Sequence, residues 1–166
     1  MSGPLAYFIT FHTYGSWLHG RAEGSIDHDH RAYGQPIPIG NPRREDGNRD
    51  RLKFPAFRLD ETRREAVLNS ILETCRHRQW NLHALHVRQN HVHLVITSPN
   101  TAPEKVLRDI KAYATRHLRR QNLLAKEASA WSEHGSTRYL WAEDQVAEKC
   151  GYTLHEQGAP VQHWPA

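Results

Sequence analysis

The sequence is poor in cysteine and contains no long apolar segment. Cys75 and Cys150 are its only cysteines, and both fall in stretches with helical spacing, so a disulfide framework is not expected. No apolar run reaches the length of about 20 residues that a bilayer-spanning helix requires. The N-terminal stretch MSGPLAYFITFHTYG lacks the charged segment and small-residue cleavage site of a secretory signal. These absences predict a cytoplasmic protein with reduced thiols and no membrane partner.

Acidic residues are outnumbered by basic ones, and histidine is frequent. The 166 residues include 22 Lys and Arg against 18 Asp and Glu, which gives a formal charge of +4, and 13 histidines come in addition. The pI near 9.3 favours a polyanionic partner such as nucleic acid, although a basic balance alone identifies none. The length fits a single domain over residues 1–166 with one hydrophobic core.

Apolar periodicity divides the chain into predicted strands and helices. Residues 18–59 are rich in Gly, Pro, Asp and Arg without a sustained period, and they predict a long irregular loop. Asp60 is the expected N-cap of the first helix, and Thr101 with Glu104 forms an expected capping box for the second. The predicted strands cover 5–17, 80–87, 91–97 and 136–142, and the predicted helices cover 60–75, 101–124 and 145–157.

This order of elements predicts an α+β fold. A strand, a long loop, a helix, two strands, a helix, a strand and a last helix follow one another along the chain. One antiparallel sheet with two helices on one face satisfies this order, as in the ferredoxin-like split βαβ arrangement. The last helix follows that unit at the C-terminal end.

Two histidines, His91 and His93, flank a valine at the start of the strand predicted for 91–97. Side chains alternate across a strand, so both imidazoles share one face while the residues between them and after them supply an apolar opposite face. The apolar face must lie under the helices, which leaves both imidazoles on the open face of the sheet. Two imidazoles about 7 Å apart along the backbone can converge on one metal ion.

The His-x-His pattern is not specific by itself. In a chain with 13 histidines about one such pattern is expected by chance, and His28 with His30 in the long loop forms a second one. No strand fixes the geometry of that second pair, which is predicted to be solvated. His83 and His86 lie on opposite faces of their predicted strand and are expected to be structural or surface residues.

The last predicted helix carries a phenol and a carboxylate on one face. Tyr152 and Glu156 are four residues apart and therefore lie one turn apart. Glu156 could complete a His-His-Glu metal site, with Tyr152 beside it as a nucleophile. Alternatively, Tyr152 packs into the core and Glu156 faces water. Tyr113 is a rival phenol, expected to be structural or a DNA contact because residue 117, one turn on, is a histidine.

The chain resembles the HUH endonuclease superfamily, and within it the single-tyrosine transposases of insertion sequences and the REP-associated tyrosine transposases. The resemblance rests on the His-hydrophobic-His strand after a helix, on GSTRYLW before the last helix, and on Tyr152 within that helix. The stretches ITFHTYGSWLHG and YTLHEQG are similar to a branch of the same family. The resemblance extends from Phe8 to Gln157, with the elements in the family's order.

The resemblance implies an enzyme that nicks and rejoins single-stranded DNA without nucleotide energy. Tyr152 matches the attacking tyrosine, which would form a 5′-phosphotyrosine, and His91 and His93 match the pair that would hold Mg²⁺ or Mn²⁺. The family's third ligand is usually Gln or Asn one turn after the tyrosine; here Glu156 occupies that position and Gln157 follows it. The implied substrate is hairpin-forming DNA, handled by a homodimer in the cytoplasm at the bacterial nucleoid.

One face of the helix predicted for 101–124 is basic. Its side chains could contact DNA phosphates, and Trp17, Tyr33 and Trp141 could stack on unpaired bases. Alternatively, the basic residues form an ordinary solvated face and the aromatic residues belong to the core. The basic residues are Arg108, Lys111, Arg116, Arg119 and Arg120.

Three further functions stay open on the sequence alone. One is a domesticated chromosomal nickase with the same chemistry. Another is a non-catalytic nucleic-acid-binding module that uses the open face of a ferredoxin-like sheet, which would favour exposed aromatic side chains where this chain has histidines. The third is a metal-dependent hydrolase that activates water and forms no covalent adduct.

Overall fold

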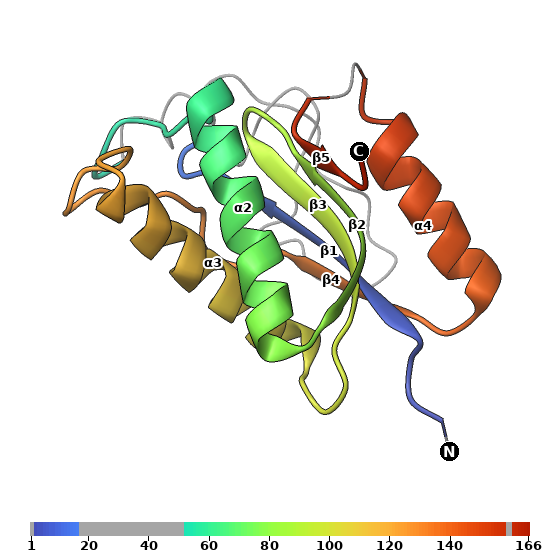
Figure 1. The fold of residues 1–166 in the computed structure, drawn as a ribbon. Helices are drawn as coiled ribbons and strands as arrows, with labels where there is room; N and C mark the ends of the chain where they lie inside the picture. Colours follow the sequence, from blue (N-terminus) through green and yellow to red (C-terminus); the bar gives the residue numbers. More distant parts are fainter. Residues whose placement is uncertain (1, 17–51, 159–160) are drawn as a thin grey trace.

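The computed structural model describes residues 2–16, 52–158 and 161–166. Its strands are β1 (Ala6–His12), β2 (Asn81–Val87), β3 (His91–Thr97), β4 (Ser136–Leu140) and β5 (His163–Trp164), and its helices are α2 (Glu61–Arg78), α3 (Pro103–Arg120) and α4 (Glu143–His155) (Figure 1). Most of the loop predicted for 18–59 lies outside the described residues, and so do Trp17, Tyr33, His28 and His30.

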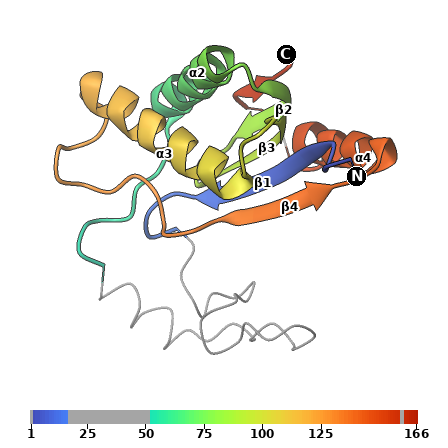
Figure 2. The same cartoon turned by 90° about the horizontal axis from the view of Figure 1, so that it is seen from below.

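The strands form one antiparallel sheet in the order β4-β1-β3-β2-β5. Helices α2 and α3 cover one face, and α4 lies against the other (Figures 1 and 2). The order of the first four strands and the two crossover helices confirms the predicted α+β, ferredoxin-like arrangement. β5 is a two-residue strand that pairs with β2, and it was not predicted because two residues carry no periodic signal.

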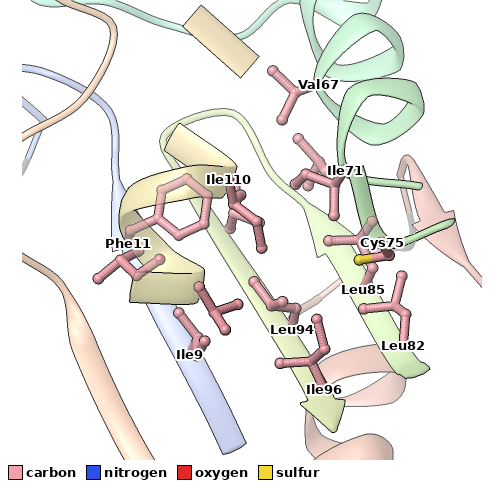
Figure 3. Packing of buried hydrophobic residues seen from close by; sticks show 14 of the residues in the cluster. Ile9, Phe11, Val67, Ile71, Cys75, Leu82, Leu85, Leu94, Ile96 and Ile110 are labelled. Carbon is pink, nitrogen blue, oxygen red and sulfur yellow. The ribbon is translucent and has the colours of Figure 1, made fainter. Parts of the chain in front are cut away.

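The main hydrophobic core fills the space between the sheet and the two helices α2 and α3 (Figure 3). Alternate strand residues such as Ile9, Leu85 and Leu94 are fully buried there against Val67 and Ile71 of α2. Burial of this apolar area, at roughly 25 cal/mol per Å², is what fixes the strand faces. Val92, Leu94 and Ile96 of β3 all belong to this core, so the predicted inward face of that strand is confirmed.

A second, smaller cluster lies on the opposite face of the sheet. Phe8, Ala84 and Val95 are buried there beneath apolar residues of α4, which include Val146 and Leu154. The prediction that this face is open is therefore wrong: α4 covers part of it. The cause is the apolar set at i, i+4 and i+8 on α4, which packs against apolar residues of β1, β2 and β3.

The ends of the helices follow local chemistry. Asp60 caps α2 as predicted, with Oδ1 accepting a hydrogen bond from the backbone N–H of Arg63 at 2.9 Å. The predicted capping box at α3 is wrong, because Ala102 is the N-cap and has no side-chain hydrogen bond. Pro103 begins α3 and has no N–H that would need a cap. No helix of the described ranges is long and apolar enough to cross a membrane.

Candidate active site

His91 and His93 project from the same face of β3, and their ring centroids are 4.7 Å apart at an interplanar angle of 74°. β3 is the central strand of the sheet, so hydrogen bonds to β1 and β2 fix its backbone on both sides. His93 is buried, and His91 is half-buried. The predicted pairing of the two imidazoles on one face is present.

Neighbouring polar groups orient both rings. Nδ1 of His91 lies 2.7 Å from Oδ1 of Asn90, and Nδ1 of His93 lies 2.7 Å from Oγ1 of Thr10. An amide oxygen only accepts, so Nδ1 of His91 donates and its Nε2 carries the lone pair of the ring. Partners on the distal nitrogen are the usual means of orienting a metal-binding histidine. The side chain of Gln157 hydrogen-bonds to both imidazoles.

Burial keeps the two imidazoles neutral. It lowers the pKa of His93 to about 3, with a smaller contribution in the same direction from the neighbouring His91. Burial also lowers the pKa of His91, against the opposing effect of its hydrogen bond with Gln157. Neutral imidazole is the form that ligates a metal ion, so the pair is ready to bind one at neutral pH without first losing protons.

The structure separates the two candidates for the third ligand. Glu156 is exposed at the C-cap of α4, where its backbone N–H donates to the carbonyl of Tyr152. Gln157 is half-buried and reaches the imidazoles. The helix predicted to extend to 157 ends at His155, with Glu156 as its C-cap.

Tyr152 lies on α4 beside the imidazoles of the same chain. Its ring centroid is 5.7 Å from that of His93, at an interplanar angle of 74°, and 5.9 Å from that of Phe8. The ring of Phe8 stacks on His93 with centroids 5.6 Å apart. Tyr152 is half-buried at the rim of the smaller cluster. The two alternatives drawn from the sequence therefore both hold in part, because the ring packs against apolar neighbours and also faces the histidine pair.

A cation stands next to the phenol. Nζ of Lys149 is 5.2 Å from the ring centroid of Tyr152 and 5.3 Å from that of Phe8. The Lys149 side chain is 18% exposed, and its Nζ also lies 4.0 Å from Oε1 of the exposed Glu148. Sequence reasoning missed this residue, although its position three residues before Tyr152 places both on one helix face. It also missed Thr10 and Phe8, which reach the site only through the pairing of β1 with β3.

Two other histidines of β2 have structural partners. Nε2 of His83 lies 2.8 Å from Oγ1 of Thr97. His86 is fully buried, with Nδ1 2.9 Å from the carbonyl of Thr153, and its Nε2 accepts a hydrogen bond from the N–H of Val161 at 3.3 Å. His86 therefore anchors Thr153, the residue after Tyr152, to the sheet.

The rival phenol and the basic stripe lie on the other side of the sheet. Tyr113 of α3 accepts a hydrogen bond from Arg78 of α2 at 3.4 Å, far from the imidazole face. A groove of about 690 Å³ lies between α3 and the segment 134–137. Four of the five predicted DNA-binding residues line it, namely Arg108, Lys111, Arg116 and Arg119, whereas Arg120 is exposed outside it.

Comparison with known proteins gives a family and a shared fold. The family model described as "Transposase IS200 like" matches residues 53–156. A REP-associated tyrosine transposase solved with a REP hairpin is similar, with a TM-score of 0.54 and 13% identity over 94% of this chain and 67% of that one. A candidate transposase from Deinococcus radiodurans R1 gives a TM-score of 0.48 and 14% identity over 96% of this chain and 95% of that one. No curated protein matches.

Proposed function

Because the chain belongs to the IS200-like transposase family, we propose that it cuts and rejoins single-stranded DNA through a covalent bond to Tyr152. The observation that carries the proposal is the meeting of Tyr152, His91 and His93 on one face of the sheet. A phenol next to two neutral, oriented imidazoles is a nucleophile next to a metal-binding pair.

The residues present fit the divalent ion that the family implies. His91, His93 and Gln157 would supply two imidazole nitrogens and one amide oxygen, and we propose Mn²⁺ or Mg²⁺ as the ion. This donor set favours Mn²⁺ over Mg²⁺, since imidazole is a poor ligand for Mg²⁺. Within the described ranges no group of three His, Cys, Asp or Glu could hold a metal, although His12 lies beside His91 with ring centroids 5.6 Å apart, and we propose Gln157 as the third protein donor. When bound, such an ion neutralises the charge that grows on the scissile phosphate.

The protein groups account for the remaining steps. The phenolic oxygen of Tyr152 attacks the phosphorus in line with the departing 3′-oxygen, so that one O–P bond forms while another breaks. The products are a 5′-phosphotyrosine and a 3′-oxygen, which takes up a proton as the phenol loses one. A 3′-hydroxyl attacks the phosphotyrosine in the reverse reaction and joins the strands without an external energy source. The ammonium group of Lys149 attracts the phosphate toward the phenol.

We further propose hairpin-forming DNA as the substrate, because the solved transposase with the same fold is bound to a REP hairpin. Within the described residues the tyrosine and the histidine pair come from a single chain. We therefore infer that one subunit assembles its own site, and that the proposed homodimer serves to bring two DNA ends together.

Formation of a covalent protein–DNA adduct tests the proposed chemistry. Wild-type protein with hairpin-bearing single-stranded DNA and Mn²⁺ or Mg²⁺ should give a band that survives denaturing electrophoresis. Tyr152→Phe should give none, while the matched control Tyr113→Phe should give the wild-type band. Cleavage that persists in Tyr152→Phe would favour a hydrolase that activates water. Tight binding without cleavage by either protein would favour a non-catalytic module.

A further inference from the structure

The groove between α3 and the segment 134–137 lies on the side of the sheet opposite Tyr152. We propose that this groove is a second nucleic-acid-binding surface, which holds a single strand by its phosphates and stacks its bases on Tyr139 and Trp141. The inference deepens the proposed function and rests on it for the identity of the strand as DNA. The argument for a strand-binding surface stands on charge, shape and exposed aromatic rings.

The charge of the groove suits a phosphate backbone. Arg108, Arg116 and Arg119 are exposed along one face of α3, and His134 faces them from the other wall. Arg119 also donates to the carbonyl of Ala128 at 3.1 Å, and the guanidinium of Arg116 lies 4.6 Å from the ring centroid of Tyr113. These contacts hold both guanidinium groups in place, and no carboxylate of the described residues forms an ion pair with either. Arginine rows of this kind bind phosphates by releasing counterions.

The groove is also lined by one carboxylate and by apolar side chains. Glu104 is the one carboxylate among its lining residues, and it accepts a hydrogen bond from Oγ1 of Thr137 at 3.2 Å. Leu107 and Ala112 give the floor an apolar surface. A cationic rim above an apolar floor fits a chain with charged phosphates and flat bases better than it fits a purely ionic ligand.

The wall formed by 134–137 has a fixed position. His134 adopts a left-handed backbone with φ 63°, and a Cβ on Gly135 would lie 2.8 Å from the carbonyl oxygen of Thr10 and 2.9 Å from Cδ2 of Leu107. The ammonium group of Lys111 donates to the carbonyls of Ser132, at 2.9 Å, and of His134. We therefore assign Lys111 to holding the groove in shape, in contrast to a direct phosphate contact. A groove that is already formed before binding loses less conformational entropy when a ligand binds.

Two exposed aromatic rings lie beyond the lining of the groove, on β4 and directly after it. Tyr139 is two residues beyond Thr137, so it lies on the same face of the strand. It is 44% exposed, Trp141 is 59% exposed, and their rings stack at a centroid distance of 6.1 Å with 17° between planes. The edge of Tyr7 supports Tyr139 at 5.2 Å. Stacked, exposed aromatic side chains are the platforms on which unpaired bases stack.

The same strand leads toward the tyrosine. β4 is an edge strand of the sheet. Arg138 alternates with Tyr139, is exposed on the opposite face, and pairs in register with Phe8, which stacks on His93. A DNA strand that leaves Tyr139 and crosses this edge would meet Arg138, whereas Phe8 lies buried beneath α4 at the candidate active site.

Binding of an unstructured oligonucleotide tests this surface separately from catalysis. The probe is fluorescein-labelled dT20, measured by anisotropy with full-length Tyr152→Phe protein in EDTA over a range of salt concentrations. Arg108→Ala with Arg116→Ala should weaken binding about tenfold and lower the slope of log K against log salt by about 1.4. Trp141→Ala should weaken binding about tenfold with the slope unchanged, because stacking releases no counterions. Far-UV circular dichroism confirms that each variant is folded.

Arg120→Ala is the matched control, since it removes the same charge from the same helix outside the groove. It should bind dT20 within about twofold of the parent protein. Equal losses for Arg120→Ala and the groove variants would overturn the proposal, as would dT20 binding unaffected by Arg108, Arg116 and Trp141. Groove-dependent binding of polyglutamate in place of dT20 would overturn it in favour of an acidic protein partner. Absence of the Tyr152 adduct together with groove-dependent dT20 binding would reject the proposed chemistry alone.

Discussion

The ring of Tyr152 stands nearly perpendicular to the imidazole of His93, with centroids 5.7 Å apart, and both residues belong to one chain. Phe8 contacts both rings from β1. Packing against Phe8 thus holds the ring of Tyr152 beside the histidine pair.

Removal of either imidazole should abolish metal binding at this site. His93→Ala removes one of the three protein donors proposed among the described residues, so we expect the affinity for Mn²⁺ to fall by at least about 100-fold. Isothermal titration calorimetry measures this loss. His83→Ala serves as the control, because His83 contacts Thr97 and lies outside the site. Unchanged Mn²⁺ affinity in His93→Ala would place the metal elsewhere.

The neighbours Glu156 and Gln157 should behave differently. Gln157→Ala removes a side chain that bonds both imidazoles, and we expect it to lower Mn²⁺ affinity about tenfold and to reduce the yield of covalent adduct. Glu156→Ala removes an exposed side chain at the end of α4 and should change neither quantity beyond about twofold. The opposite ranking of the two variants would return the third-ligand role to Glu156.

Thr10 should act on the reaction through His93. Thr10→Val keeps the shape of the side chain and removes the hydroxyl that lies 2.7 Å from Nδ1. Loss of such a partner typically costs about 10- to 100-fold in metal affinity or activity. Conservation of the fold is checked by urea denaturation. Thr10→Ser retains the hydroxyl and should recover most of the affinity, and its failure to do so would show that packing by the methyl group matters more than the hydrogen bond.

The buried histidine should make the metal-free protein sensitive to acid. The pKa of His93 is about 3 in the folded chain and near 6.5 in the unfolded chain, so the unfolded state binds the extra proton between these values. Stability is therefore complete above about pH 6.5 and declines as the pH falls toward 3, by up to about 1.4 kcal/mol per pH unit. Urea denaturation in EDTA between pH 7 and 5 measures this slope. His93→Asn, which does not titrate, should show a shallower dependence, and equal slopes would contradict the assignment.

The sequence was sufficient to predict those elements whose residues interact with near neighbours along the chain. The strand His91–Thr97 follows from its short run of apolar and β-branched residues, and Asp60 caps α2 because its carboxylate reaches the N–H of Arg63. The choice between Glu156 and Gln157 was beyond the sequence, because it depends on where α4 ends. Thr10 and Phe8 could not be found either, since they meet His93 only through a strand pairing more than 80 residues away along the chain.

The same limit explains the error about the imidazole face. Helical spacing predicted α4, but the spacing does not indicate against which face of the sheet a last helix packs. Phe8, Val95 and Leu140 offered an apolar patch beside the histidines, and α4 packs on it. The site is consequently partly enclosed by the helix that carries its tyrosine, and this enclosure accounts for the buried, neutral state of His93.

The absence of a side chain at Gly135 links the two sides of the sheet. Its α-carbon sits against the carbonyl of Thr10, and Thr10 carries the hydroxyl that orients His93 on the far side. A single added methyl group at position 135 would push on the backbone of β1 from the groove. A displacement of the groove wall at Gly135 would therefore press directly on the backbone of the residue whose hydroxyl orients His93.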